Sequence, residues 1–138
     1  MKFLLDTNII SEVMRPQPNP LVIKQLELNS IFSCTSATVW LELWHGIHSM
    51  QDGQRKQGLI EYMNLLADDG LGVLPFCQNS AEWLAKERVR LKAKGIIAAK
   101  YDSEIAAVAV VNQLTLVTNN TRDFEIFDGL VMVNWHQQ

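Results

Sequence analysis

The sequence has 138 residues, of which 48% are hydrophobic and 20% charged, and its formal net charge is −3. This length suits one domain, residues 1–138, and the composition excludes an intrinsically disordered chain. The negative net charge excludes a general attraction to nucleic acid, so any such binding needs a local positive patch.

Two features of the chain favour a cytoplasmic protein. The apolar run Phe3–Leu5 is too short for a signal-peptide core, and no run reaches the ~18 residues of a membrane span. The two cysteines, Cys34 and Cys77, have neither a CxxC nor a metal-ligand spacing. We therefore expect both to be small core residues of a protein in a reducing compartment, with no membrane partner.

Short apolar runs alternate with longer segments of helical period along the chain. The runs predict strands at Lys2–Asp6, Ile31–Cys34, Leu71–Pro75, Leu114–Val117 and Leu130–Asn134. This alternation predicts a single α/β domain whose central, mostly parallel sheet of about five strands is flanked by helices.

The first predicted strand ends on Asp6-Thr7-Asn8. Residues of these types end strands and cap helices, and we expect Thr7 or Asn8 to supply the cap. Asp6 would then point into the crevice beyond the carboxyl ends of the parallel strands, where ligands bind in open α/β sheets. A plain capping role for Asp6 is the alternative.

The segment Ser36–Met50 predicts a helix with one apolar stripe. The stripe consists of Val39, Leu43, Ile47 and Met50. Glu42 falls about 60° from Val39 at ~100° per residue, so it flanks the buried stripe. A carboxylate in this position costs free energy unless it is paired or binds a cation, although a buried arginine or a backbone partner is the alternative.

Later segments bring further polar groups to the same sheet edge. Asn79-Ser80-Ala81-Glu82 matches a capping box and predicts a helix that stops near Gly95. The apolar segment Ile105–Val111 predicts a helix buried in the core, with Asp102 at its polar start. The strand Leu114–Val117 delivers residues 118–123 to the edge. Asp102 taken alone is also explained as a first-turn charge.

Several acids at one sheet edge, without Cys or His ligands, suit a hard divalent cation. Mg²⁺ and Mn²⁺ prefer oxygen ligands and are held by a few carboxylates while a substrate phosphate completes the shell. Such cations activate water for attack on phosphodiesters. Two other classes stay open: an aspartyl phosphatase, whose second aspartate would stand at Asn8, and a receiver module, which needs an acceptor aspartate on the Leu71–Pro75 strand.

Four stretches carry a family resemblance: FLLDTNIISEV at 3–13, TSATVWLELWHGI at 35–47, KYDSEIAAVAV at 100–110 and LTLVTNNTRDFEIFDGLVMVNW at 114–135. In this order and spacing they resemble PIN-domain ribonucleases, specifically VapC-type toxins of bacterial toxin–antitoxin pairs. The resemblance implies an endoribonuclease whose Asp6, Glu42 and Asp102 bind Mg²⁺, with Mn²⁺ as a substitute. The family's fourth acidic position is Asn120 here, a departure, and Asp123 lies close enough to replace it.

The same resemblance implies partners. These are a transfer or ribosomal RNA substrate, a second copy of the chain, and a small VapB-type antitoxin that covers the site and forms a larger assembly with the toxin. For RNA binding, Lys86, Arg90 and Lys94 form an i, i+4, i+8 row running toward Asp102, although a solvated helix face explains them equally well. Asn8 could cap the helix, orient Asp6 or touch a metal-bound water.

Overall fold

The computed structural model describes residues 1–137, in which strands alternate with helices as the sequence predicts. The strands are β1 (Phe3–Leu5), β2 (Ser33–Ser36), β3 (Gly72–Leu74), β4 (Thr115–Val117) and β5 (Met132–Val133). The α-helices are α1 (Thr7–Glu12), α2 (Pro20–Asn29), α3 (Ala37–His48), α4 (Gln54–Asp68), α5 (Gln78–Ala93), α6 (Lys100–Val111) and α7 (Thr121–Phe124). No helix in this described part is long and apolar enough to cross a membrane.

The strands form one sheet in the order β3-β2-β1-β4-β5, and each neighbouring pair is parallel. Leu4 in the middle of β1 lies opposite Cys34 of β2 and Leu116 of β4. Because the strands are parallel, their carboxyl ends meet at one edge of the sheet. The predicted sheet is confirmed, and over residues 1–137 its pairings are parallel throughout.

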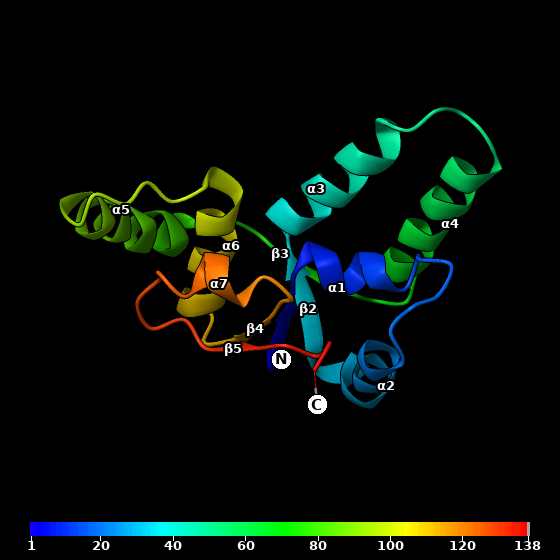
Figure 1. Ribbon diagram of the computed structural model, residues 1–138, viewed down its shortest axis with the longest axis horizontal. Coiled ribbons are helices and arrows are strands. Elements are labelled where there is room, and N and C mark those ends of the chain that lie inside the picture. The colour runs from blue at the N-terminus through cyan, green and yellow to red at the C-terminus, as the bar shows by residue number, and fades with distance from the viewer. Residues whose placement is uncertain (138) are drawn as a thin grey trace.

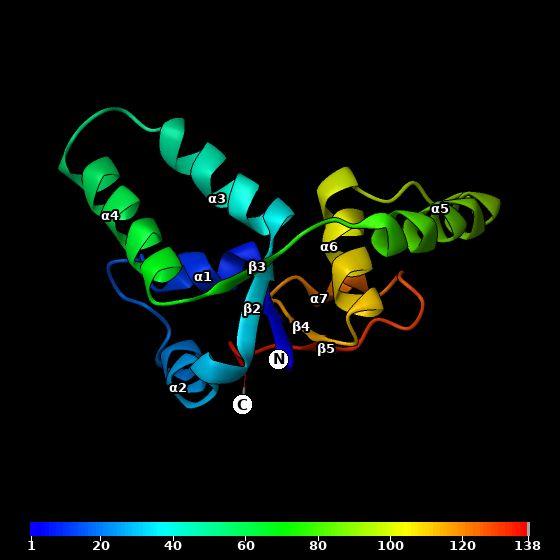
Figure 2. The ribbon, with the colours of Figure 1, turned by 180° about the vertical axis from the view of Figure 1, so that it is seen from behind.

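The chain adds strands on both sides of β1, and the connecting helices therefore cover both faces of the sheet. β2 and β3 add on one side of β1, whereas β4 and β5 add on the other. Figures 1 and 2 show α1–α4 on one side of the sheet and α5–α7 on the other. The strand order reverses between β1 and β4, and the crevice beyond the strand ends at such a reversal is where α/β domains bind ligands.

The core is built from the central strands and α6. Leu4, Leu116 and Val117 are fully buried, and so is each residue from 105 to 109. The predicted buried helix is confirmed for these residues. Because α6 is fixed against the sheet in this way, its first turn, which carries Asp102, has a fixed place at the carboxyl edge.

Local sequence explains several helix boundaries. Asn19 caps α2 by accepting a 2.8 Å hydrogen bond from the Leu21 amide, and Pro20 follows it in the first turn. Ser36 caps α3 through a 3.2 Å bond from the Val39 amide to its hydroxyl. Gly95 adopts a φ of 74°, a left-handed conformation that glycine tolerates, just beyond the end of α5 as predicted.

Three local predictions are wrong. Ile31 and Phe32 lie in an exposed 3-10 turn (Ser30–Phe32), so β2 starts at Ser33 rather than at Ile31. The helix α5 begins at Gln78 after the cap position Cys77, so the proposed capping box lies inside its first turn. Its Ser80 is buried against the Cys77 sulfur at 3.4 Å instead of capping. Cys77 itself is exposed, whereas Cys34 is buried as expected.

Candidate active site

Asp6 lies at the end of β1, is only 4% exposed, and is held in place by three hydrogen bonds. Its Oδ1 accepts from the Thr7 amide at 2.8 Å, and its Oδ2 accepts from Asn8 Nδ2 at 3.0 Å and Thr118 Oγ1 at 2.8 Å. Asp6 is therefore itself the cap of α1. The expectation that Thr7 or Asn8 supplies the cap is wrong, because both lie within the first turn.

Asn8 ties the end of β1 to the end of β4. Its Nδ2 reaches Asp6 and also Thr118 Oγ1 at 3.4 Å, and its Oδ1 accepts from the Asn119 amide at 2.9 Å. Asn119 Oδ1 in turn accepts from Asn134 Nδ2 at 3.3 Å. Both ends of the Asn8 amide are thus engaged inside the protein, which favours the orienting role among the alternatives for this residue.

Glu42 comes to the site from α3 and flanks its buried stripe as predicted. Its side chain is half-buried, and its Oε1 accepts a 3.0 Å hydrogen bond from Thr7 Oγ1. Burial raises the pKa of Glu42, and the charges of Asp6 and Asp102 raise it further, whereas the Thr7 hydrogen bond opposes the shift. The carboxylates of three separate elements are therefore close enough to repel one another.

Asp102 lies half-buried in the first turn of α6. Burial raises its pKa, and the charges of Asp6 and Asp123 raise it further. Asp123 is exposed on α7. Asn120 occupies the cap position of the same helix, and its amide donates to Thr118 Oγ1 at 3.0 Å. The structure thus brings all five predicted acidic and amide positions to one edge of the sheet.

The pKa of Asp6 is also raised. Burial is the largest cause, and the hydrogen bonds from Thr118, Thr7 and Asn8 offset only part of it. None of the ion pairs found within residues 1–137 involves Asp6, Glu42 or Asp102. The site is a set of mutually repelling, partly buried carboxyl groups without a cationic side chain among them.

An all-oxygen donor set of this kind suits a hard divalent cation. Within the described residues, however, no three Asp, Glu, His or Cys side chains already converge into a closed metal-binding group. The acids match the cation in chemistry and in charge, but in this arrangement they do not yet converge on one ion.

Three polar residues near the site were not predicted to belong to it, although Thr7 was expected to cap a helix. Thr118 and Thr7 hydrogen-bond Asp6 and Glu42 respectively. Glu104 accepts from Thr38 Oγ1 at 3.0 Å and joins α6 to α3. Thr7 and Thr118 directly follow predicted strands, and Glu104 lies two residues after Asp102. These positions were the features of the sequence from which a role near the site could have been predicted.

The predicted basic row on α5 is interrupted. Arg90 donates to the buried Glu87 and, at 2.8 Å, to the carbonyl oxygen of Ile126, so it holds α5 to the segment after α7. Lys86 and Lys94 are exposed. Only these two lysines of the row are available to a ligand, and RNA binding by the row stays a prediction.

Fold and site together define a doubly wound α/β domain with a carboxylate centre at its strand reversal. Residues 3–130 match the PIN domain, and the chain belongs to the PIN-domain family. The resemblance inferred from its four stretches is confirmed.

Individual relatives are similar over nearly their whole length. Toxin FitB of Neisseria gonorrhoeae is 36% identical over 138 residues, covering 96% of this chain and 98% of FitB. The tRNA(fMet)-specific endonuclease VapC of Shigella flexneri is 32% identical over 135 residues, or 98% of each chain. The crystal structure of DNA-bound VapBC from Salmonella typhimurium superposes with a TM-score of 0.84 at 29% identity, covering 98% of each chain.

Proposed function

We propose that this protein is an endoribonuclease toxin that hydrolyses RNA phosphodiester bonds with a divalent cation held by Asp6, Glu42 and Asp102. One observation carries the proposal: carboxyl groups from the end of β1, from α3 and from α6 meet at the strand reversal, where the charge of Asp6 raises the pKa of both Glu42 and Asp102. The relatives add support, because they include a toxin and a tRNA-specific endonuclease.

Asp6 and Glu42 would contribute to cation binding in different ways. A bound Mg²⁺ or Mn²⁺ supplies a Lewis acid for a phosphoryl oxygen and an activated water. Asp6 is the rigid ligand, since the Thr7 amide, Asn8 and Thr118 fix both of its oxygens. Glu42 keeps Oε1 on Thr7, so its second oxygen is the one available to the cation.

Asp123, rather than Asn120, is the better candidate for the fourth acidic position. Its charge raises the pKa of Asp102, which requires that the two carboxyl groups be close. Asn120 carries no charge, and its bond to Thr118 runs through its backbone amide, which a change of side chain leaves in place.

The proposed partners follow from the family. We propose that the RNA is a transfer or ribosomal RNA, with Lys86 and Lys94 as outlying phosphate contacts. A small antitoxin of the VapB type would neutralise a dimer of this chain in the cytoplasm and form the larger assembly. The VapBC neighbour from Salmonella typhimurium, solved on DNA, supports this arrangement.

The test is cleavage of total RNA by the purified protein in Mg²⁺, Mn²⁺ or EDTA. We expect discrete fragments in either metal, none in EDTA, and none from Asp6→Asn or Glu42→Gln. Glu61→Gln is the matched control, because Glu61 is exposed on α4, away from the acids. Cleavage that persists in EDTA and in Asp6→Asn would overturn the proposed metal–carboxylate site.

A further inference from the structure

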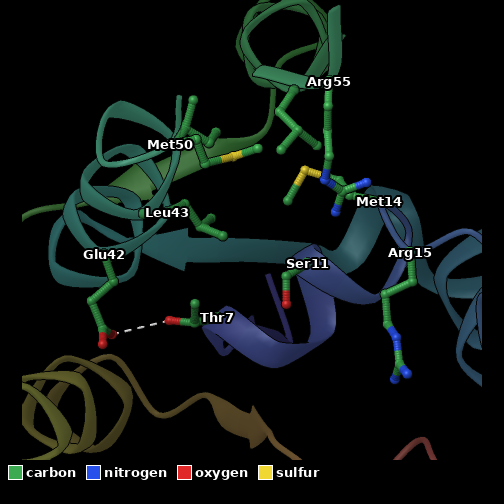
Figure 3. Close-up of a pocket in the computed structure, with 11 residues that line it drawn as sticks. Thr7, Ser11, Met14, Arg15, Glu42, Leu43, Met50 and Arg55 are labelled. Carbon is green, nitrogen blue, oxygen red and sulfur yellow. Dashed lines mark hydrogen bonds between the residues drawn. The ribbon is translucent and has the colours of Figure 1, made fainter. Parts of the chain in front are cut away.

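A cavity of about 330 Å³ lies between α1, α3 and α4, directly beside the acidic site. Thr7 and Glu42, joined by their 3.0 Å hydrogen bond, form the wall that the cavity shares with the site (Figure 3). Anything that fills this cavity therefore lies next to whatever the carboxylates hold.

The lining is mostly apolar, with few polar groups and two cations. The apolar wall consists of Met14, Leu43, Ile47, Met50 and Leu59. The Ser11 and Thr7 side chains add hydroxyl groups, and Arg15 and Arg55 add guanidinium groups. In Figure 3, Arg55 extends from α4 toward Met14. Arg55 has no ion-pair partner within residues 1–137, and Arg15 is 67% exposed beside Glu12.

This combination matches a nucleotide. A nucleobase has apolar faces and a polar edge, and the flanking phosphates are negative. Thioether groups are polarizable and pack well against aromatic rings, while guanidinium groups both stack on bases and bind phosphates. Arg55, which has no ion-pair partner within residues 1–137, would stay without one beside a purely apolar ligand.

We propose that the cavity is a pocket for one unpaired nucleobase of the RNA, beside the phosphodiester that the acids hold. This inference rests on the proposed ribonuclease function and adds a base-binding subsite to it. A base can enter a cavity in the protein only after leaving its stack, either from a single strand or by flipping out of a duplex.

Gly46 offers a way to fill the pocket without replacing an acid. It lies on the cavity wall one turn after Glu42, and a Cβ at this position would meet no heavy atom within 4 Å. Helical side chains tilt toward the N-terminus, so a leucine here would extend toward the Glu42 turn. Gly46→Leu also raises helix propensity and is expected to fold. The matched control is Gly58→Leu, since Gly58 on α4 is equally open and lies outside the pocket lining.

The experiment uses a short single-stranded RNA that the wild-type protein cleaves, with an abasic nucleotide placed at each position around the cut. We expect one position at which the abasic change lowers kcat/KM about tenfold, the effect of losing one stacked base. Gly46→Leu should lower kcat/KM on the intact RNA by about the same factor and lose sensitivity to that abasic position. Gly58→Leu should behave like the wild type.

Binding supplies a readout that does not depend on cleavage. In the Asp6→Asn background, fluorescence anisotropy should show weaker RNA binding for Gly46→Leu. Arg55→Gln should also weaken binding and reduce its salt dependence, whereas Lys24→Gln, an exposed change on α2, should not. Arg55→Gln and the abasic series still decide the question if Gly46→Leu does not fold.

The outcomes separate the two proposals. Wild-type protein that cuts no RNA would overturn the proposed function itself. Normal cleavage with no sensitive abasic position, or a Gly46→Leu protein that cuts at the wild-type rate, would overturn the base pocket alone. Normal cleavage by Gly46→Leu together with lost inhibition by an antitoxin would assign the cavity to a protein partner instead.

Discussion

Asp6 and Glu12 stand at the two ends of the same short helix, α1, and each is only 4% exposed. Their surroundings act in opposite directions: the pKa of Asp6 is raised, whereas that of Glu12 is lowered. The helix dipole would favour the reverse, because it stabilises an acid at the N-terminus and destabilises one at the C-terminus. The partners of each carboxylate therefore decide the difference.

Glu12 has the contacts of a structural acid. It accepts from the Asn19 amide at 2.8 Å, which lowers its pKa most, and from Arg15 at 3.3 Å, and it lies 3.2 Å from His136 Nε2. These bonds join α1 to the start of α2 and to the C-terminal segment. Glu87 is held in a similar way by Arg90 and, at 2.8 Å, by the Asp128 amide.

Asp6, by contrast, is surrounded by neutral donors and other acids. Its hydrogen bonds set its orientation but do not neutralise its charge, and Glu42 and Asp102 respond to that charge. Burial alone does not mark a functional acid here, since Glu12 is buried as deeply. The absence of a cationic partner from the described residues around Asp6 is the distinguishing feature.

The largest expected effect is on activity. Asp6→Asn should lower RNA cleavage at least about a hundredfold, because it removes a charge on which the cation depends. The free energy of unfolding should change by less than about 1 kcal/mol, since a buried unpaired charge is removed along with its hydrogen bonds. Cleavage assays and urea unfolding measure the two. A large loss of stability without loss of activity would make Asp6 the structural acid.

Glu12→Gln should show the opposite pattern. It weakens bonds from Asn19, Arg15 and His136, so we expect a loss of about 1–3 kcal/mol in the free energy of unfolding. Cleavage per folded molecule should stay within about twofold of the wild type, since α1 keeps its cap at Asp6 and its ties through Asn8. If Glu12→Gln instead abolished cleavage while leaving unfolding unchanged, the two acids could not be divided in this way.

Thr118→Val tests whether orientation of Asp6 matters separately from its charge. The change keeps the shape of the side chain but removes its hydroxyl. It thereby removes the 2.8 Å hydrogen bond that lowers the pKa of Asp6 and the acceptor for Asn8 Nδ2 and the Asn120 amide. We expect cleavage to fall about tenfold and its pH profile to move to higher pH. Thr115→Val, on the strand β4 that ends just before Thr118, is the control. A drop in rate with an unshifted pH profile would point to packing alone.

The smallest expected effect is on the pH dependence of stability. In EDTA, the raised pKa values of Asp6, Asp102 and Glu42 mean that the native site keeps protons that the unfolded chain loses at the ordinary pKa values of 3.8 and 4.5. The free energy of unfolding should therefore fall as the pH rises from these ordinary values through the raised ones. Asp6→Asn should make this fall smaller. Glu12 has the opposite sign: its contribution is present above 4.5 and is lost as the pH falls through its lowered pKa. Urea unfolding at stepped pH checks both; equal slopes for wild type and Asp6→Asn would contradict the assignment.

The sequence predicted which strand ends would carry acids, because apolar runs, turn residues and helical period are local features. It also identified the buried helix at Ile105–Val111 and the place of Glu42 beside an apolar stripe. It did not predict that Thr118 holds Asp6, since the two are 112 residues apart in the chain. Nor did it predict that Arg90 is held within the protein: Glu87 is near in sequence, but the Ile126 carbonyl that the other end of Arg90 contacts is not.

The exposed positions of Cys77, Ile31 and Phe32 were missed for a different reason. Residue type predicts burial only on average, and each of these residues stands where a turn or a helix start directs it outward. The pKa shifts and hydrogen-bond partners that separate Asp6 from Glu12 likewise depend on the assembled fold. The residue pattern predicted the candidate site, whereas packing determined which acid has no cationic side chain as a partner within residues 1–137.

Calorimetric titration of Mn²⁺ into the wild-type protein at stepped pH above the ordinary carboxyl pKa values, in two buffers of different ionisation enthalpy, tests the central claim most directly. If Asp6, Glu42 and Asp102 are held for a cation, binding will release protons, because the metal displaces them from carboxyl groups whose pKa is raised. Asp6→Asn should lose this binding, and Glu12→Gln should keep it. Mn²⁺ binding without proton release, or with equal strength in Asp6→Asn, would contradict the account.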